Sequence, residues 1–171
     1  MDEGHGTRLR HEEVYAGRIF SVARDHVRLP QGVEATLEVV RHPGSVVLLP
    51  MPDPDHVILV KQYRYAIDQW VWELAAGSLE PGEDPAEGAA RECEEETGLA
   101  AGDLQFLGAF YPTPGYCDEL MDFFRLTALA APSAVSYQRL KPHHWSASWT
   151  TLGEKDREAT LRICPTSERP A

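Results

Sequence analysis

Four glutamates crowd the second half of one short segment, at a spacing suited to binding a divalent cation. Glu92 and Glu96 are four residues apart, and Glu95 is three residues after Glu92, so on a helix these side chains lie on adjacent turns. Arg91 can offset only one of these charges, most easily that of Glu95. Negative charge near the C-terminal end of a helix is unfavourable, and a bound cation would remove the repulsion. Carboxylate oxygens favour Mg²⁺ or Mn²⁺ over zinc.

The element that must carry these glutamates is a helix predicted over residues 85–97. Asp84 is suited to cap its start, Pro85 to occupy its first position, and Gly98 to adopt the left-handed conformation that ends it. An acidic face turned toward solvent is the alternative interpretation of the same charges. The face expected to pack on a sheet consists of small residues at helical spacing, namely Ala86, Ala90, Cys93 and Thr97.

The wider stretch, residues 77–99, resembles the signature of the Nudix family. The specified positions of that signature are filled without a gap by Gly77, Glu83, Arg91, Glu92, Cys93, Glu95, Glu96, Gly98 and Leu99. Cys93 is the mildest departure, because a buried cysteine behaves as a small hydrophobic residue. The resemblance implies an α/β fold, an α/β/α sandwich around a mixed β-sheet with this helix on one face.

The resemblance also implies a metal site and a catalytic base. The implied ligands of Mg²⁺, or of Mn²⁺, are three carboxylates and one backbone carbonyl, from Glu92, Glu95, Glu96 and Ala76. The base that positions or deprotonates water is Glu119 or Glu95, and the sequence leaves both open. Arg91 is expected to set the orientation of Glu95. Glu83 is expected to act as an outer-shell ligand or as a loop anchor.

The segment that leads into the signature, residues 61–77, resembles the corresponding part of ADP-sugar pyrophosphatases. This resemblance implies that Arg64 and Glu73 help to hold the nucleotide, and a guanidinium can grip a phosphate with two hydrogen bonds. Tyr63 offers an aromatic face on which an adenine could stack. The alternative for Tyr63 is ordinary packing at the end of an amphipathic strand.

A loop with two prolines and a glycine follows, at residues 111–119. Pro114 falls fifteen residues after Leu99, close to where a proline marks the Nudix subgroup that cleaves ADP-ribose, so Pro114 and Gly115 are expected to contact substrate. A purely structural turn is the alternative. The implied reaction is metal-dependent hydrolysis of ADP-ribose to AMP and ribose 5-phosphate. Another nucleotide-sugar or dinucleotide substrate remains open, as does an ADP-ribose-sensing module without turnover.

Composition limits the classes of partner. The chain has 171 residues and a formal net charge of −11, which argues against nucleic acid or an anionic membrane as its main partner. The partner that the resemblance implies is a small-molecule nucleotide. No apolar run is long enough to span a bilayer. Three widely spaced cysteines suit reduced thiols in the cytoplasm rather than a disulfide framework.

The expected organisation is one domain with a different character at each end. Residues 1–13 are expected to be flexible, residues 14–130 to form the hydrolase domain, and residues 131–171 to form an atypical C-terminal tail. An N-terminal β-hairpin is predicted from strands near 20–29 and 34–40, and the resemblance implies a homodimer formed through it. Further strands are predicted at 45–50, 57–62, 105–111 and 120–129.

The tail is set apart by its charge. Residues 1–130 carry a net charge of −13, whereas residues 131–171 carry +2. The acidic stretch, strand and amphipathic helix that usually end chains of this subgroup are not recognisable in it. Either the tail is divergent, or a change of reading frame replaced the usual ending.

Overall fold

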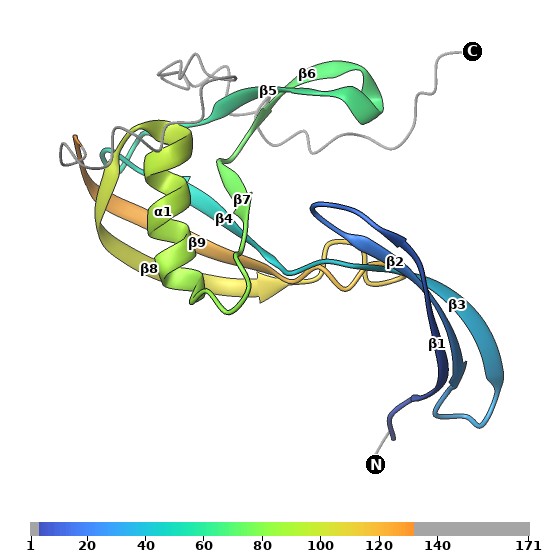
Figure 1. The fold of residues 1–171 in the computed structure, drawn as a ribbon. Helices are drawn as coiled ribbons and strands as arrows, with labels where there is room; N and C mark the ends of the chain where they lie inside the picture. Colours follow the sequence, from blue (N-terminus) through green and yellow to red (C-terminus); the bar gives the residue numbers. More distant parts are fainter. Residues whose placement is uncertain (1–3, 132–171) are drawn as a thin grey trace.

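The computed structural model describes residues 4–131 (Figure 1). Its strands form a three-stranded sheet in the order β1-β2-β3, a four-stranded sheet in the order β7-β4-β9-β8, and a two-stranded hairpin of β5 and β6. The elements are β1 (Thr7–Ala16), β2 (Ser21–Arg28), β3 (Glu34–Arg41), β4 (Ser45–Pro50), β5 (Val60–Arg64), a 3₁₀ turn η1 (Tyr65–Ile67), β6 (Gln69–Glu73), β7 (Ala76–Ser78), α1 (Pro85–Thr97), β8 (Ala100–Phe110) and β9 (Met121–Ala130).

The four-stranded sheet is mixed, and α1 lies across one of its faces (Figure 1). Strand β4 pairs in parallel with β9, whereas β7 and β8 pair antiparallel at the two edges. This arrangement confirms the predicted α/β fold. Within residues 4–131 there is one α-helix, and the predicted tail falls almost wholly outside the described residues. The core beneath α1 is built from Val46, Leu48, Val60, Ala75, Ala89, Cys93, Phe124 and Leu126.

Helix α1 has the predicted bounds because its two ends are specified locally. The Asp84 side chain accepts hydrogen bonds from the backbone N–H groups of Ala86 and Glu87, and Gly98 adopts a left-handed φ of 71°. The buried face differs from the predicted one. Ala89 and Cys93 are fully buried, whereas Ala86 is exposed. The helix is rotated relative to the predicted orientation, so that Glu92 and Glu96 are buried as well.

The N-terminal element contains one strand more than the predicted hairpin. Residues 7–13, expected to be flexible, belong to β1, which pairs antiparallel with β2 and makes a sheet with β3. All ten residues of β1 are exposed, so the strand has none of the alternation by which a half-buried strand is recognised. Figure 1 shows this sheet extending away from the four-stranded sheet.

The remaining strands follow the predictions with shifted ends. β4 has the predicted bounds and β9 begins one residue late, whereas β8 begins five residues earlier than expected. β5 begins three residues late, because Ile58 donates its N–H to the Pro50 carbonyl at the end of β4 instead. Within the described residues, no helix has the length and apolar character needed to cross a membrane.

Candidate active site

Two glutamates of α1, Glu92 and Glu96, are buried rather than exposed to solvent. Glu92 is 2% exposed and Glu96 is 8% exposed, which excludes the interpretation of a solvated acidic face for these two side chains. Burying a carboxylate is costly unless other groups compensate its charge. For Glu92, part of this compensation comes from Arg91, whose Nη1 lies 2.6 Å from Glu92 Oε1.

Strand β7 provides the space that the Glu92 carboxylate occupies. A Cβ added to Gly77 would lie 1.9 Å from Glu92 Cδ and 2.2 Å from each of its carboxylate oxygens. Only glycine leaves room at this position, since any side chain would meet the carboxylate itself. Gly77 therefore holds Glu92 against the edge strand by having no side chain.

The backbone of β7 places a carbonyl oxygen beside this carboxylate. The Ala75 carbonyl accepts a hydrogen bond from Leu48 N–H of β4. Because hydrogen-bond directions alternate along an antiparallel pair, the carbonyl of the next residue, Ala76, points away from β4 toward the open edge of the sheet. Ala76 is the neighbour of Gly77, so this carbonyl and the Glu92 carboxylate belong to the same edge of the sheet, and the role of Ala76 as a metal ligand stays a prediction.

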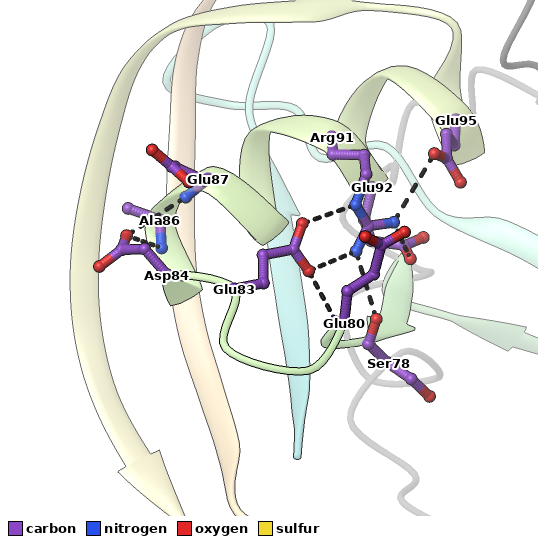
Figure 2. A network of polar contacts seen from close by, with 9 residues as sticks. All are labelled: Ser78, Glu80, Glu83, Asp84, Ala86, Glu87, Arg91, Glu92 and Glu95. Atoms are coloured by element: carbon purple, nitrogen blue, oxygen red, sulfur yellow. Dashed lines mark hydrogen bonds and ion pairs between the residues drawn. The ribbon is translucent and has the colours of Figure 1, made fainter. Parts of the chain in front are cut away.

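Arg91 is the centre of the charge network around Glu92 (Figure 2). Its Nη1 donates to Glu92 Oε1 at 2.6 Å, and the same nitrogen lies 3.6 Å from Glu95 Oε1. Its Nη2 donates to the Ser78 carbonyl at 3.2 Å. The expectation that Arg91 offsets only one glutamate of the helix was wrong, because its guanidinium contacts both Glu92 and Glu95.

The strongest of these partners is Glu83 in the loop before α1. Arg91 Nε and Nη2 each donate to one carboxylate oxygen of Glu83 at 2.8 Å, a two-pronged geometry that fixes both groups. The second oxygen also accepts from Glu80 N–H at 2.9 Å. The hydrogen bonds from Arg91 lower the pKa of Glu83 to about 2. These contacts are those of a loop anchor.

Acid should weaken the fold through Glu83. Its pKa is lower in the folded chain, about 2 instead of 4.5, so its stabilising effect is present above pH 4.5 and is lost as the pH falls from 4.5 to 2. Because solvent screens part of the interaction, we expect a contribution on the order of 2 kcal/mol. Urea unfolding midpoints measured from pH 7 to pH 2.5 should fall less steeply for Glu83→Gln than for the unmodified chain. Equal slopes for the two proteins would contradict this assignment.

The donor chemistry of this edge fits a divalent cation. Glu92, Glu95 and Glu96 supply carboxylate oxygens and Ala76 supplies a carbonyl oxygen, which is the type of ligand set that Mg²⁺ and Mn²⁺ prefer. Within residues 4–131, however, no three His, Cys, Asp or Glu side chains converge closely enough to hold a metal ion. Arg91 holds Glu92 and lies near Glu95, so the carboxylates would have to turn toward a cation as it binds.

The predicted nucleotide-binding residues lie on the hairpin of β5 and β6. Arg64 and Glu73 are joined side by side, with Arg64 Nη2 donating to Glu73 Oε2 at 2.6 Å and Arg64 Nε donating to the same oxygen at 2.9 Å. Tyr63 donates its hydroxyl proton to Asp68 and its ring lies 5.6 Å from that of Trp70. Tyr63 is 41% exposed, so one part of the ring remains accessible to a ligand.

The predicted site residues of the loop at 111–119 differ in their exposure and contacts. Pro114 and Gly115 are exposed, and a Cβ on Gly115 would meet nothing within 4 Å. Glu119 instead accepts a hydrogen bond from Ser45 Oγ at 2.9 Å and lies 3.7 Å from His42 Nδ1.

Glu119 lies on a different side of the sheet from the glutamates of α1. Val46 packs with Ala89 and Cys93 of α1 in the core, and side chains alternate between the faces of a strand. Ser45, and Glu119 bonded to it, therefore lie toward the face opposite α1. The structure places Glu92 against Gly77 of β7, whereas Glu119 is bonded to Ser45 and does not lie there.

The sequence did not predict a second polar cluster, which contacts the loop at residues 111–119. It comprises residues of three N-terminal strands and of the loop itself, namely His11, Asp25, Arg41 and Asp118. Nothing in the local sequence marks these residues, because they meet only when β1, β2, β3 and the loop are assembled.

Comparison with known proteins shows the family of this chain. The family model "NUDIX domain" matches residues 40–161, which extends past residue 130, the predicted end of the hydrolase domain. The chain is similar to "ADP-ribose pyrophosphatase" of Bacillus subtilis (strain 168), with 40% identity over 66% of this chain and 61% of the relative. It is also similar to "ADP-ribose pyrophosphatase" of Mycobacterium tuberculosis, with 37% identity over 89% of this chain and 72% of the relative.

A solved structure extends the comparison to the fold. The structure described as "Crystal structure of ADP compounds hydrolase" matches with a TM-score of 0.72 and 25% identity, covering 91% of this chain and 84% of that one. The chain spans less than two thirds of the length of the Bacillus subtilis relative. The family model matches well over half of the chain, and the buried glutamates of α1 lie where its signature requires them. The chain therefore belongs to the Nudix family.

Proposed function

We propose that this protein hydrolyses ADP-ribose to AMP and ribose 5-phosphate with the help of a divalent cation, Mg²⁺ or Mn²⁺. The observation that carries the proposal is the burial of Glu92 and Glu96 on α1, with the Glu92 carboxylate lying in the space that Gly77 of β7 leaves open. Nudix hydrolases generally depend on divalent metals. The names of the two relatives and the description of the solved structure support an ADP-linked substrate.

Each residue has a role in this proposal. Glu92, Glu96 and the Ala76 carbonyl hold the cation, which when bound neutralises phosphate oxygens and lowers the pKa of a water molecule. Arg91 keeps Glu92 and Glu95 in position. Glu95 is the better candidate for the base that orients the attacking water, because Glu119 is bonded to Ser45 on the opposite side of the sheet.

The substrate is proposed to lie between the hairpin and the proline loop. Tyr63 offers an exposed ring face for the adenine, and the Arg64–Glu73 pair supplies a guanidinium and a carboxylate beside it. Pro114 and Gly115 contact the substrate from the loop, where both are exposed. These contacts would bind the nucleotide without contributing to bond cleavage.

We also propose a cytoplasmic homodimer formed through the N-terminal sheet. β1 is an edge strand whose backbone groups on one side are open to pairing. Large apolar side chains of this sheet are exposed, among them Leu9, Val14 and Leu37. The two cysteines of the described residues, Cys93 and Cys117, are free thiols, which suits a reducing compartment. Sedimentation velocity would test the dimer directly.

The deciding experiment is turnover by the purified chain. We expect AMP release from ADP-ribose with Mg²⁺, measured by chromatography, and loss of that release when EDTA is added before substrate. Restoring activity with excess Mg²⁺ or Mn²⁺ would exclude damage by the chelator. A chain that melts cooperatively and binds ADP-ribose without releasing AMP would contradict hydrolysis and favour a sensing role.

A broader substrate range is the second candidate. The solved structure's description names ADP compounds rather than ADP-ribose alone. A panel of ADP-ribose, other ADP-sugars and dinucleotides, compared by kcat/KM under the same conditions, would distinguish the two. We expect ADP-ribose to give the highest kcat/KM. If another compound gives a higher kcat/KM, that compound is the better substrate and the proposal of ADP-ribose is contradicted.

A further inference from the structure

Asp25 of β2 is a buried carboxylate far from the signature helix in the sequence. It is 2% exposed, and both of its oxygens have cationic or polar neighbours. His11 Nδ1 of β1 lies 2.6 Å from Oδ1, and Arg41 Nη2 of β3 donates a hydrogen bond to Oδ2. Burial raises the pKa of Asp25, but the hydrogen bonds with His11 and Arg41 outweigh this and hold the pKa below its usual value. Asp25 thus carries a negative charge inside the N-terminal sheet.

Arg41 extends this contact from the sheet to the proline loop. Its Nη1 donates to Asp118 Oδ2 at 3.0 Å, so one guanidinium bridges a carboxylate of β2 and a carboxylate of the loop. The other oxygen of Asp118 accepts from His42 N–H at 2.9 Å. Two carboxylates on either side raise the pKa of Arg41, chiefly through the bond with Asp118. The Arg41 guanidinium is therefore charged at neutral pH.

The backbone of the loop is attached to the same end of β3. Val40 N–H donates to the Tyr116 carbonyl at 2.7 Å, and Asp118 N–H donates to the Val40 carbonyl at 3.1 Å. These bonds fix residues 116–118, and the Arg41 bridge fixes the side chain of Asp118. The exposed Pro114 and Gly115 come immediately before this attachment, and Glu119 comes immediately after it.

We propose that Asp25 is a positioning residue for the proline loop, acting through Arg41 and Asp118. By holding one end of the guanidinium, Asp25 restricts where the other end can place Asp118. Without it, Arg41, whose side chain is 36% exposed, is free to turn toward solvent, and the loop retains only its backbone attachment. The N-terminal sheet thereby sets the geometry of the loop. The effect on substrate binding rests on the proposed function of that loop.

The first test measures the loop directly and needs no substrate. Hydrogen–deuterium exchange of the peptide covering residues 112–119 should be about tenfold faster in Asp25→Asn than in the unmodified chain, the effect of losing one charged hydrogen bond. The matched control is Asp53→Asn, which removes an exposed aspartate whose Oδ1 lies 2.7 Å from His56 Nδ1. Like Asp25, Asp53 contacts a histidine, but it lies in a different turn, between β4 and β5. Unchanged exchange of the loop in Asp25→Asn, with an intact N-terminal sheet, would overturn the proposal.

A second variant covers the case in which Asp25→Asn loosens the whole N-terminal sheet. Arg41→Gln leaves the contact between His11 and Asp25 in place and removes the bridge, and it should accelerate loop exchange to the same extent while peptides of β1 and β2 exchange normally. If the effect of Asp25 passes through Arg41, hydrogen–deuterium exchange of the loop should be no faster in the double variant Asp25→Asn, Arg41→Gln than in Arg41→Gln alone. An additive increase would overturn the proposed route.

The kinetic test separates positioning from a merely structural role. In Asp25→Asn and Arg41→Gln we expect KM for ADP-ribose to rise about tenfold while kcat changes less than twofold, since the loop binds substrate without taking part in bond cleavage. A fall in kcat at unchanged KM would overturn the proposal. If the unmodified chain does not turn over ADP-ribose, the proposed function fails, whereas the exchange experiment still decides whether Asp25 positions the loop.

Discussion

Replacing Glu92 by glutamine is expected to lower kcat for ADP-ribose by at least about 10²–10³-fold, with the fold intact. Glutamine keeps an oxygen that can accept the hydrogen bond from Arg91 Nη1 and has nearly the same shape as glutamate. It lacks the negative charge that a divalent cation requires. We expect the same result for Glu96→Gln, because Glu96 is buried one turn further along the same face of α1.

The matched control for this pair is Glu94→Gln, which removes a glutamate of the same helix that lies outside the signature. Initial rates with saturating Mg²⁺ and ADP-ribose, together with thermal melts followed by circular dichroism, would distinguish loss of charge at the site from loss of structure. Near-normal activity in either Glu92→Gln or Glu96→Gln would refute a metal-binding role for that residue.

Replacing Gly77 by alanine is expected to lower activity by about 100-fold or more, because a reacting group is displaced by more than 1 Å. The new Cβ would lie 1.9 Å from Glu92 Cδ, so the carboxylate must leave its position. The obstructed atoms are the far end of a flexible side chain, and Gly77 does not have a positive φ. The substitution should therefore cost little stability while moving the carboxylate away from the Ala76 carbonyl.

Gly6→Ala is the control for this experiment, since a Cβ there meets only the Arg28 carbonyl at an ordinary 3.6 Å. Activity and melting temperature should be measured together for both variants. Full activity of Gly77→Ala would contradict this prediction, because it would show that turnover does not depend on the position of the Glu92 carboxylate.

The sequence predicts those parts of the molecule that are specified locally. The bounds of α1 follow from Asp84, Pro85 and Gly98, whose conformational preferences act within one turn of the helix. β4 follows from a short apolar run that becomes buried. The choice of Glu92, Glu95 and Glu96 as proposed metal ligands follows from a long motif, whereas composition alone does not distinguish them from Glu94.

Features that depend on tertiary packing were not predictable in the same way. The rotation of α1 buries Ala89 instead of Ala86, and small residues at every third or fourth position do not reveal which of two similar faces meets the sheet. β1 is exposed along its whole length, so no hydrophobic period marks it. The contacts of Asp25 and Asp118 with Arg41 join strands and a loop that are distant in the sequence.

The parallel pairing of β4 with β9 has a consequence for how the chain acquires its structure during synthesis. The strands of the N-terminal sheet each pair with their neighbour in the sequence, so this sheet needs only short loops to close and can form early. β4 instead pairs with β9, near the other end of the described residues, and long-range pairing of this kind slows folding. During synthesis, the N-terminal sheet can therefore form while the core is still incomplete. β4 can pair with β9 only after residues 121–126 have left the ribosome.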